Sequence, residues 1–212
     1  MAAMSAVTRE SATAPGGGVR IRPPRAGDAP ELRRFYLELS DESRRRRFLG
    51  FSRGLTDAQA ARFCRHGFVA TAPSGSAERI VGHLSLEPVE PHVEEVAVAV
   101  ADEWQHQGIG RALYAAALRS AEWRGVRRLE ATMFAYNTPI RGLLTGAGRR
   151  YRISSDELGT LNLTIDLKAT VDEQRDEPTG TASQTLPECG WTNRSNASKA
   201  RLQLPASTPA MA

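Results

Sequence analysis

Residues 93–113 of the chain read VEEVAVAVADEWQHQGIGRAL, and this stretch decides the predicted fold. A continuous apolar run from Val96 to Val100 is typical of a strand that is buried on both faces. A short polar segment follows, and then Gly108 and Gly110 precede a helical pattern of apolar residues. The stretch therefore predicts a strand, a glycine-containing turn and the start of a helix.

The turn between this strand and this helix has the features of a phosphate-binding site. Glycine lets the backbone pass close to a ligand with its N–H groups pointing outward. The first N–H groups of a helix have no acceptor within the helix, and the helix dipole adds partial positive charge there. We therefore expect a nucleotide or a coenzyme pyrophosphate at this turn.

The spacing of the glycines separates the motifs that bind phosphate. A P-loop needs Lys followed by Ser or Thr after its last glycine, but the chain has Arg111 and Ala112. A dinucleotide fingerprint needs a third glycine where the chain has Leu113. What remains is Q-x-x-G-x-G, from Gln105 to Gly110, behind a strand that opens with glutamates. The alternative is a plain turn without a chemical role.

Composition indicates one folded domain without a membrane or secretory segment. The chain has 212 residues, of which 41% are hydrophobic. No apolar run reaches the ~18 residues of a membrane span, and no apolar h-region opens the chain, so we expect a cytoplasmic protein. The two cysteines and four histidines lack metal-ligand spacing, so we expect no metal. The net charge of +4 suits an anionic coenzyme or an acidic partner, although a general bias towards Arg would also explain it.

Periodicity and turn residues predict the order of the other elements. Before the central strand they predict a strand, three helices and a hairpin, at residues 19–22, 28–39, 41–48, 56–64, 68–71 and 79–87. After the glycine turn they predict a helix, a strand, a second helix and two closing strands, at residues 110–124, 127–134, 139–147, 149–153 and 159–167. A turn is expected at 88–92, and Gly148 is expected to end the second helix. This order indicates an α+β (mixed α/β) domain whose parallel part surrounds the glycine turn.

The two ends of the chain differ in composition from its centre. Residues 1–18 are rich in Ala, Ser, Thr and Gly, and residues 169–212 are rich in Pro, Thr, Ser, Ala and Glu. Segments of this kind bury too little apolar surface to fold. We therefore expect a disordered leader at 1–18, one folded domain at 19–168 and a disordered tail at 169–212.

With these elements in place, residues 19–167 resemble the GNAT family of N-acetyltransferases. Two segments carry the resemblance, EVAVAVADEWQHQGIGRAL at 95–113 and GVRRLEATMFAYNTPIRGLL at 125–144. A third segment, LSDESRRRRF at 39–48, is similar to one in the Pat-like branch, whose members acetylate protein lysines. The resemblance implies a mostly antiparallel seven-stranded sheet, with a parallel βαβ unit for acetyl-CoA and helices on both faces.

The resemblance also implies acetyl-CoA as the co-substrate, without a metal. Main-chain groups of Val98, Ala99 and Val100 would pair with pantetheine, and one N–H group there would polarise the thioester carbonyl. The rest of the expected coenzyme site is the loop of Gln105, His106, Gln107, Gly108, Ile109, Gly110 and Arg111, with the amides from His106 onward on the pyrophosphate. Asn137 matches a family position near the thioester, and its alternative reading is a simple turn residue before a helix.

An amine acceptor titrates near ~10.4, so a base must remove a proton before the nitrogen attacks. Glu95 aligns with the glutamate of the Pat-like pattern and is the expected catalytic base. Glu94 is the second choice, because neighbours on a strand point to opposite faces. Many family members carry a Tyr where this chain has Leu144, and the spacing of Tyr136 and Tyr151 supports neither as a replacement. We therefore assign no general acid.

These observations lead to one function and one alternative from another class. The expected function is an N-acetyltransferase that moves an acetyl group from acetyl-CoA to an amine, either a protein lysine or a small amine. The alternative is a non-catalytic sensor that binds acyl-CoA. A nucleic-acid-binding protein is disfavoured, because the Arg-rich segment at 44–47 has no recognition-helix or aromatic-interleaved pattern. We expect no nucleic-acid and no membrane partner.

Overall fold

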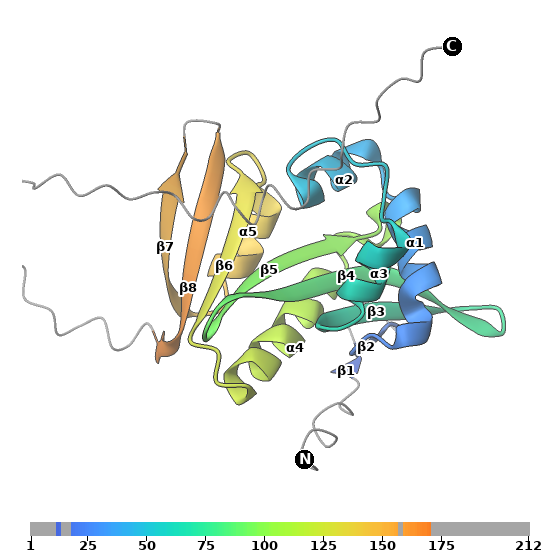
Figure 1. Cartoon of the computed structure of the whole chain (residues 1–212), viewed down its shortest axis with the longest axis horizontal. Helices are drawn as coiled ribbons and strands as arrows, with labels where there is room; N and C mark the ends of the chain where they lie inside the picture. The colour runs from blue at the N-terminus through green and yellow to red at the C-terminus, as the bar shows by residue number, and fades with distance from the viewer. Residues whose placement is uncertain (1–11, 14–17, 157–158, 171–212) are drawn as a thin grey trace, which may run out of the picture. The chain divides into compact units, whose positions relative to one another are not determined.

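The computed structural model describes residues 12–13, 18–156 and 159–170 (Figure 1). The predicted leader at 1–18 and the predicted tail at 169–212 lie almost entirely outside the described residues. Within the described ranges, no helix has both the length and the apolar character needed to cross a membrane.

The centre of the fold is one mixed sheet. Its strands lie in the order β1-β2-β3-β4-β5-β6-β8-β7, and every pair is antiparallel except β5 with β6. The strands are β1 (Ala12–Thr13), β2 (Arg20–Arg22), β3 (Gly67–Ser74), β4 (Ala77–Glu90), β5 (Val93–Val100), β6 (Arg128–Phe134), β7 (Arg149–Ser155) and β8 (Thr160–Thr170). The predicted fold is confirmed: β2 to β8 form a seven-stranded, mostly antiparallel sheet with one parallel pair, to which the two-residue β1 is added.

Within the described residues, five α-helices and two short 3-10 helices join the strands. They are η1 (Ala26–Asp28), α1 (Ala29–Glu38), α2 (Asp41–Phe48), α3 (Asp57–Phe63), η2 (Asp102–Trp104), α4 (Ile109–Trp123) and α5 (Thr138–Thr145). Local signals set several ends: the Thr56 side chain caps α3 by accepting from Gln59 N–H, and Gly125 follows α4 with a φ of 75°. The predicted order of strands and helices is therefore confirmed along the described domain.

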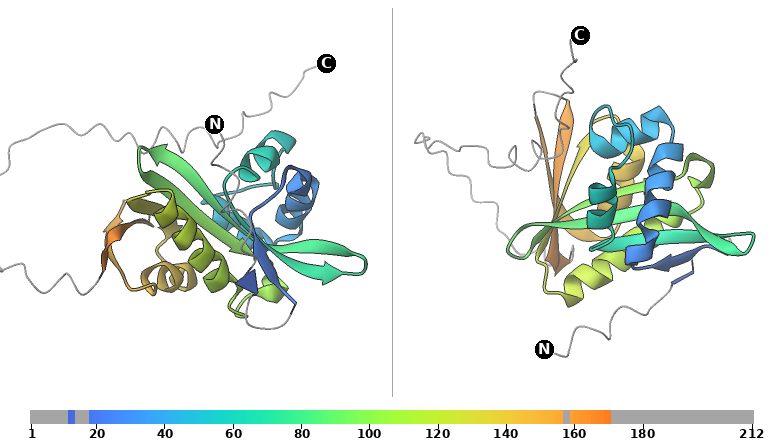
Figure 2. Two further views of the ribbon diagram at one scale, coloured as in Figure 1. Left: turned by 90° about the horizontal axis from the view of Figure 1, so that it is seen from below. Right: turned by 45° about the vertical axis from the view of Figure 1, so that its right-hand side comes forward.

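The helices cover both faces of the sheet and bury two separate cores (Figure 2). One face packs against α4 and α5, and its core includes Val96 of β5. The other face packs against α1, α2 and α3, and its core includes Ala99 of the same strand. Because successive side chains of a strand alternate between faces, the apolar run in β5 supplies both cores at once. This is why the strand lacks polar positions after Glu95.

Several predicted boundaries differ from the structure by a few residues, and for two of them the structure shows the physical reason. The turn expected at 88–92 is shorter, because β4 continues to Glu90 and pairs with Val93. The strand tolerates Pro88, since β3 pairs with β4 only up to Ser85 and leaves no partner for the missing N–H.

The second error concerns the end of α5. The helix begins at Thr138 rather than Pro139 and ends at Thr145, before Gly146. Ala147, expected on its inner face, is exposed, and Gly148 lies beyond the helix in the turn to β7, with a φ of 68°. Two glycines inside the segment 142–146 lower its helix propensity and account for the early end.

Candidate active site

The sheet opens between its two parallel strands. Pairing of β5 with β6 covers only three positions, from Val93 opposite Arg128 to Glu95 opposite Glu130. Beyond them β5 continues to Val100 and β6 to Phe134, but the two strands no longer pair (Figure 1). We call this opening the split.

The main chain of β5 directs polar groups into the split. Ala101 N–H donates to Val81 O on β4 at 2.9 Å, and the direction of hydrogen bonding alternates along a strand. Ala99 therefore pairs with His83 on β4, while Val98 and Val100 direct their N–H and C=O groups to the other side. On that side no strand of the described residues pairs with them. Of the three residues expected to pair with pantetheine, Val98 and Val100 thus have the required orientation.

The glycine turn ends the same strand and opens α4. Gly108 is the N-cap residue of α4 with a φ of 80°, and no side chain caps the helix. Ala112 N–H is the first to reach back, donating to Gly108 O at 3.0 Å, so the amides of Ile109, Gly110 and Arg111 precede the helical hydrogen bonds. An uncapped helix N-terminus with outward N–H groups fits a pyrophosphate.

Gly110 lies where the turn faces the split. A Cβ atom there would lie 3.5 Å from Leu143 and 3.9 Å from Val100, which are ordinary contacts. The protein itself would therefore accept a side chain at this position. His106, also in the turn, has a φ of 61°, a conformation that few residues other than glycine adopt.

The two glutamines of the turn bind the protein rather than point outward. Gln105 Nε2 donates to Val100 O at 3.1 Å and to Ser43 Oγ at 3.3 Å. Gln107 Nε2 donates to Glu103 O at 2.9 Å. Their side chains hold the loop in shape, so their part in a coenzyme site is to position its backbone.

A hydrogen-bonded cluster joins the turn to α2. Asp102 accepts from Ser40 N–H at 2.9 Å, from Ser40 Oγ at 2.8 Å and from Ser43 Oγ at 2.6 Å. Partial burial alone would raise the pKa of Asp102, but these hydrogen bonds outweigh it and hold the pKa below its usual range. The first residues of α2 and the approach to the glycine turn are thereby fixed to each other.

The neighbouring glutamates Glu94 and Glu95 lie on opposite faces, as strand alternation predicts. Glu94 is buried and forms an ion pair with Arg124 at the end of α4, with Nη2 and Oε2 2.8 Å apart. Glu95 is half-buried on the other face, opposite Glu87 of β4 and Glu130 of β6. Glu95 therefore stands at the last paired position before the split, whereas the carboxylate of Glu94 is engaged away from it.

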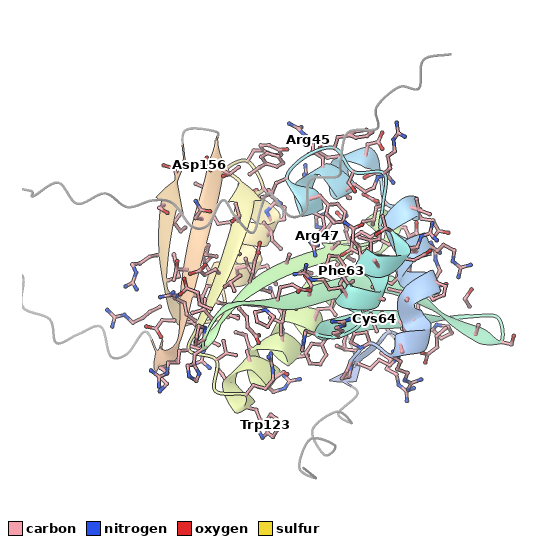
Figure 3. The ribbon with its side chains drawn as sticks, viewed as in Figure 1. Arg45, Arg47, Phe63, Cys64, Trp123 and Asp156 are labelled. Carbon is pink, nitrogen blue, oxygen red and sulfur yellow. The ribbon has the colours of Figure 1, made fainter. Side chains whose placement is uncertain are left out.

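Helix α2 covers the split on the face that carries Glu95. The Arg45 guanidinium lies 5.1 Å from the centre of the Phe134 ring at the end of β6, and Arg46 lies 5.8 Å from Tyr136 (Figure 3). Phe134 and Tyr136 stack with centres 5.2 Å apart. These contacts tie α2 to the far side of the split, so the segment 41–48 forms one wall of its opening.

The remaining predicted residues lie in different places beyond β6. Asn137 is 9% exposed and is the N-cap residue of α5, but its side chain makes no cap hydrogen bond. Leu144 is buried in the core, and its carbonyl accepts from the hydroxyl of Tyr114 at 3.3 Å. Burial raises the pKa of Tyr114, so this phenol stays protonated. Tyr151 is exposed on β7, two strands away from β6.

Sequence reasoning missed two groups near the split. Asp102 lies in the short polar segment after the predicted strand, and its partners Ser40 and Ser43 lie in the third segment of the resemblance. Ser85 of β4 lies opposite Ala97 and accepts from Arg47 at 2.9 Å, and no local pattern marks it. Among the described residues, no cluster of His, Cys, Asp and Glu side chains is placed to hold a metal ion.

Comparison with known proteins agrees with this geometry. The family model described as the acetyltransferase (GNAT) family matches residues 31–148. The crystal structure of the GNAT domain of PAT from S. lividans is similar with a TM-score of 0.64 and 26% identity, over 74% of this chain and 96% of that chain. Structures with lower identity share the fold. One is yncA from Salmonella typhimurium with its cofactor acetyl-CoA, at TM-score 0.52 and 17% identity over 70% of this chain and 92% of that chain.

A sheet that splits beside an uncapped helix N-terminus offers unpaired main-chain groups to an extended anionic ligand, and the family match gives the class as that of the acetyltransferases. The match covers more than half of the 212 residues, and the chain belongs to the acetyltransferase (GNAT) family. It is an acetyl-CoA-dependent N-acetyltransferase, with acetyl-CoA as its co-substrate.

Proposed function

We propose that the protein acetylates the side-chain amine of a lysine in a protein acceptor, with Glu95 as the base. The observation that carries the proposal is the position of Glu95, at the last paired residue before the split and on the face that α2 covers. Helix α2 is the segment that resembles the Pat-like branch, and the GNAT domain of PAT is similar over 96% of its length.

Charge on this face supports a cationic acceptor. Glu87, Glu95 and Glu130 occupy directly opposite positions on three neighbouring strands. Like charges at such positions repel, and Arg62 and Arg128 offset part of this by pairing with Glu87 at 2.9 Å and Glu130 at 3.2 Å. A row of carboxylates beside the split favours an ammonium group over a neutral or anionic one.

The proposed reaction begins with the proton of the acceptor. Glu95 takes one proton from the ammonium, directly or through a water molecule, and leaves a nitrogen lone pair free. The nitrogen attacks the thioester carbonyl and forms the C–N bond while the carbonyl electrons move to oxygen. These electrons return as the C–S bond breaks and the thiolate leaves, and the nitrogen gives its second proton to solvent. Because thiols titrate near ~8.5, the thiolate leaves without a dedicated acid.

The backbone would hold the coenzyme during these steps. The outward N–H groups of the turn from His106 to Arg111 would bind the pyrophosphate. Val98 and Val100 would pair with pantetheine along the open side of β5, and Asn137 would contact the coenzyme near the thioester. This assignment uses the uncapped start of α4 and the unpaired side of β5 together.

The purified protein, labelled acetyl-CoA and a lysate of its own cells provide the test. We expect label on proteins, on lysine side chains when the products are digested and analysed by mass spectrometry, and little label with Glu95→Gln. Label confined to small molecules would overturn the protein acceptor. Label on proteins at the same rate with Glu95→Gln would overturn the role of Glu95.

A further inference from the structure

One peptide group of β5 connects the split on one side of the strand with strand β4 on the other side. Ala101 bonds to β4, and every second residue of β5 before it does the same, which includes Ala97. Ala97 is the register partner of Ser85, so Ala97 O accepts from Ser85 N–H. Ser85 Oγ also donates to Ala97 O, at 3.5 Å. The N–H of the same peptide group belongs to Val98 and points into the split. Two donors thus act on the carbonyl end of a peptide group whose N–H end faces the proposed site of the thioester.

The guanidinium of Arg47 binds the Ser85 hydroxyl that donates to Ala97 O. Arg47 Nη2 donates to Ser85 Oγ at 2.9 Å, and Ser85 is 2% exposed. The guanidinium lies over the rings of Phe48 and Phe63, at 5.2 Å and 5.3 Å from their centres, between α2 and α3 (Figure 3). These rings fix the guanidinium over β4, so its charge reaches the peptide group through one buried hydroxyl.

The chain of contacts runs from Arg47 through Ser85 to the Ala97 carbonyl and on to the Val98 N–H. Hydrogen bonds in such chains polarise one another, most strongly when one member is charged. A carbonyl that accepts from polarised donors makes the N–H of its own peptide group a better donor. The effect is largest where negative charge develops on the group that this N–H binds.

The same arrangement is absent at the other amides of this side of β5. Val96 lies next to the last paired position, where its N–H is used in the pairing with Glu130. Val100 N–H shares its peptide group with Ala99 O, and no described side chain donates to that carbonyl. Val98 is therefore the one amide of the open side, among the described residues, that a charged side chain polarises.

We propose that Arg47, acting through Ser85, is a positioning residue of the transfer reaction. It strengthens the Val98 N–H that binds the thioester carbonyl oxygen as negative charge develops there. The inference rests on the proposed function, because it requires the acetyl group to lie in the split. It adds the particular amide and the side chains that tune it.

Infrared spectroscopy of bound acetyl-CoA tests this directly. With a 13C label on the acetyl carbonyl and no acceptor present, the parent protein should lower the carbonyl stretching frequency relative to free acetyl-CoA. Arg47→Gln and Ser85→Ala should return the band towards its free position. Their kcat should fall about tenfold, part of the ~10²–10³ lost when an oxyanion donor is removed outright. Their affinity for acetyl-CoA should stay within about twofold.

Arg33→Gln is the control, because Arg33 is on α1 and binds Leu55 O and Asp57 instead of Ser85. It should leave the band in its parental position. Ser85→Ala changes one buried hydroxyl, so it keeps the test open if Arg47→Gln fails to fold. An equal shift in the parent, Arg47→Gln and Ser85→Ala would overturn the inference, as would losses of affinity that match the losses of kcat.

Failure of the proposed function would look different. In that case the parent protein itself would bind acetyl-CoA without shifting the band, or would shift it with Glu95→Gln as active as the parent. A band that moves in Ser85→Ala while the acceptor proves to be a small amine would leave the role of Arg47 intact.

Discussion

The two ends of strand β5 differ in sequence and in role: the first carries two glutamates and the second is apolar. At Val93 to Glu95 the strand pairs on both sides, and at Val98 to Val100 it pairs only with β4. The first end is structural, with Glu94 buried in an ion pair beneath the sheet. The second end presents main-chain donors and acceptors that no described strand uses. The candidate site thus lies where the pairing of β5 with β6 stops. Glu95, at this boundary, is next to both the fully paired end and the end that pairs only with β4.

The largest effect is expected from a substitution at Glu95, the last residue of β5 that pairs with β6. Glu95→Gln keeps the shape of the side chain and removes its basicity. We expect kcat to fall by roughly 10²–10⁴, the usual contribution of a positioned base, with nearly unchanged affinity for acetyl-CoA. The residual rate should rise with pH, because solvent then deprotonates more of the acceptor. Steady-state kinetics across pH gives the answer, and equal losses of binding and turnover would make Glu95 structural.

The second end of β5, from Val98 to Val100, is open on the side of the split. A substitution in the glycine turn that follows it should block the binding of the coenzyme. Gly110→Asp adds a carboxylate where the protein leaves room for a side chain but the pyrophosphate would lie. We expect acetyl-CoA affinity to fall by about 10²-fold or more, equivalent to two lost hydrogen bonds to a charged group. Calorimetric titration measures it, with Gly27→Asp as a control, since a Cβ at Gly27 meets nothing within 4 Å. Unchanged affinity would remove the turn from the coenzyme site.

A buried histidine lies beside the open end of β5 and makes the stability of the fold depend on pH. His83, opposite Ala99, is fully buried, and desolvation followed by the charge of Arg47 lowers its pKa to about 3. The unfolded chain binds a proton there below its ordinary pKa near ~6.5, but the folded chain does not, so stability falls as pH drops from there towards 3.

The expected slope from this one group is up to ~1.4 kcal/mol per pH unit. Urea unfolding at pH 5 and pH 7 should show a smaller pH effect for His83→Gln than for the parent. His66→Gln serves as the control, because His66 is exposed. A parental pH dependence that survives His83→Gln would assign the effect to another group.

The smallest expected effect concerns the closed end. Glu94→Gln removes the partner of Arg124, whose side chain is 31% exposed and therefore partly hydrated. We expect the free energy of unfolding to fall by about 1–2 kcal/mol, below the usual cost of breaking a fully buried pair. Turnover should remain close to that of the parent. A loss of kcat as large as that of Glu95→Gln would contradict the assignment of the two neighbours to different faces.

Local patterns predicted much of this molecule, for reasons that the structure makes clear. The apolar run from Val96 to Val100, the glycine turn and the alternation of Glu94 and Glu95 are properties of neighbouring residues. They follow from the local periodicity of strands and helices, which a sequence shows directly. The same holds for the α2 segment, whose predicted bounds of 41–48 match the helix.

What sequence reasoning missed depends on contacts between distant residues. The position where β5 and β6 stop pairing, after Glu95 and Glu130, involves two strands whose paired residues are 35 positions apart in the sequence. Ser40 and Asp102 are 62 residues apart, and Arg47 and Ser85 are 38 apart, so no periodicity relates them. The boundary at Pro88 was likewise decided by the neighbouring strand, since β3 pairs with β4 only up to Ser85. The end of α5 differs, because Gly142 and Gly146 stand in the sequence itself.

The Asp102 cluster has a consequence for the history of the sequence. Ser40 and Ser43 donate to Asp102 with three hydrogen bonds, so loss of the carboxylate would leave two hydroxyls and one amide without their acceptor. A substitution at one of these positions therefore leaves the hydrogen-bonding groups of the others without a partner. Among relatives that keep both helix α2 and the glycine turn, Ser40, Ser43 and Asp102 should covary as one unit.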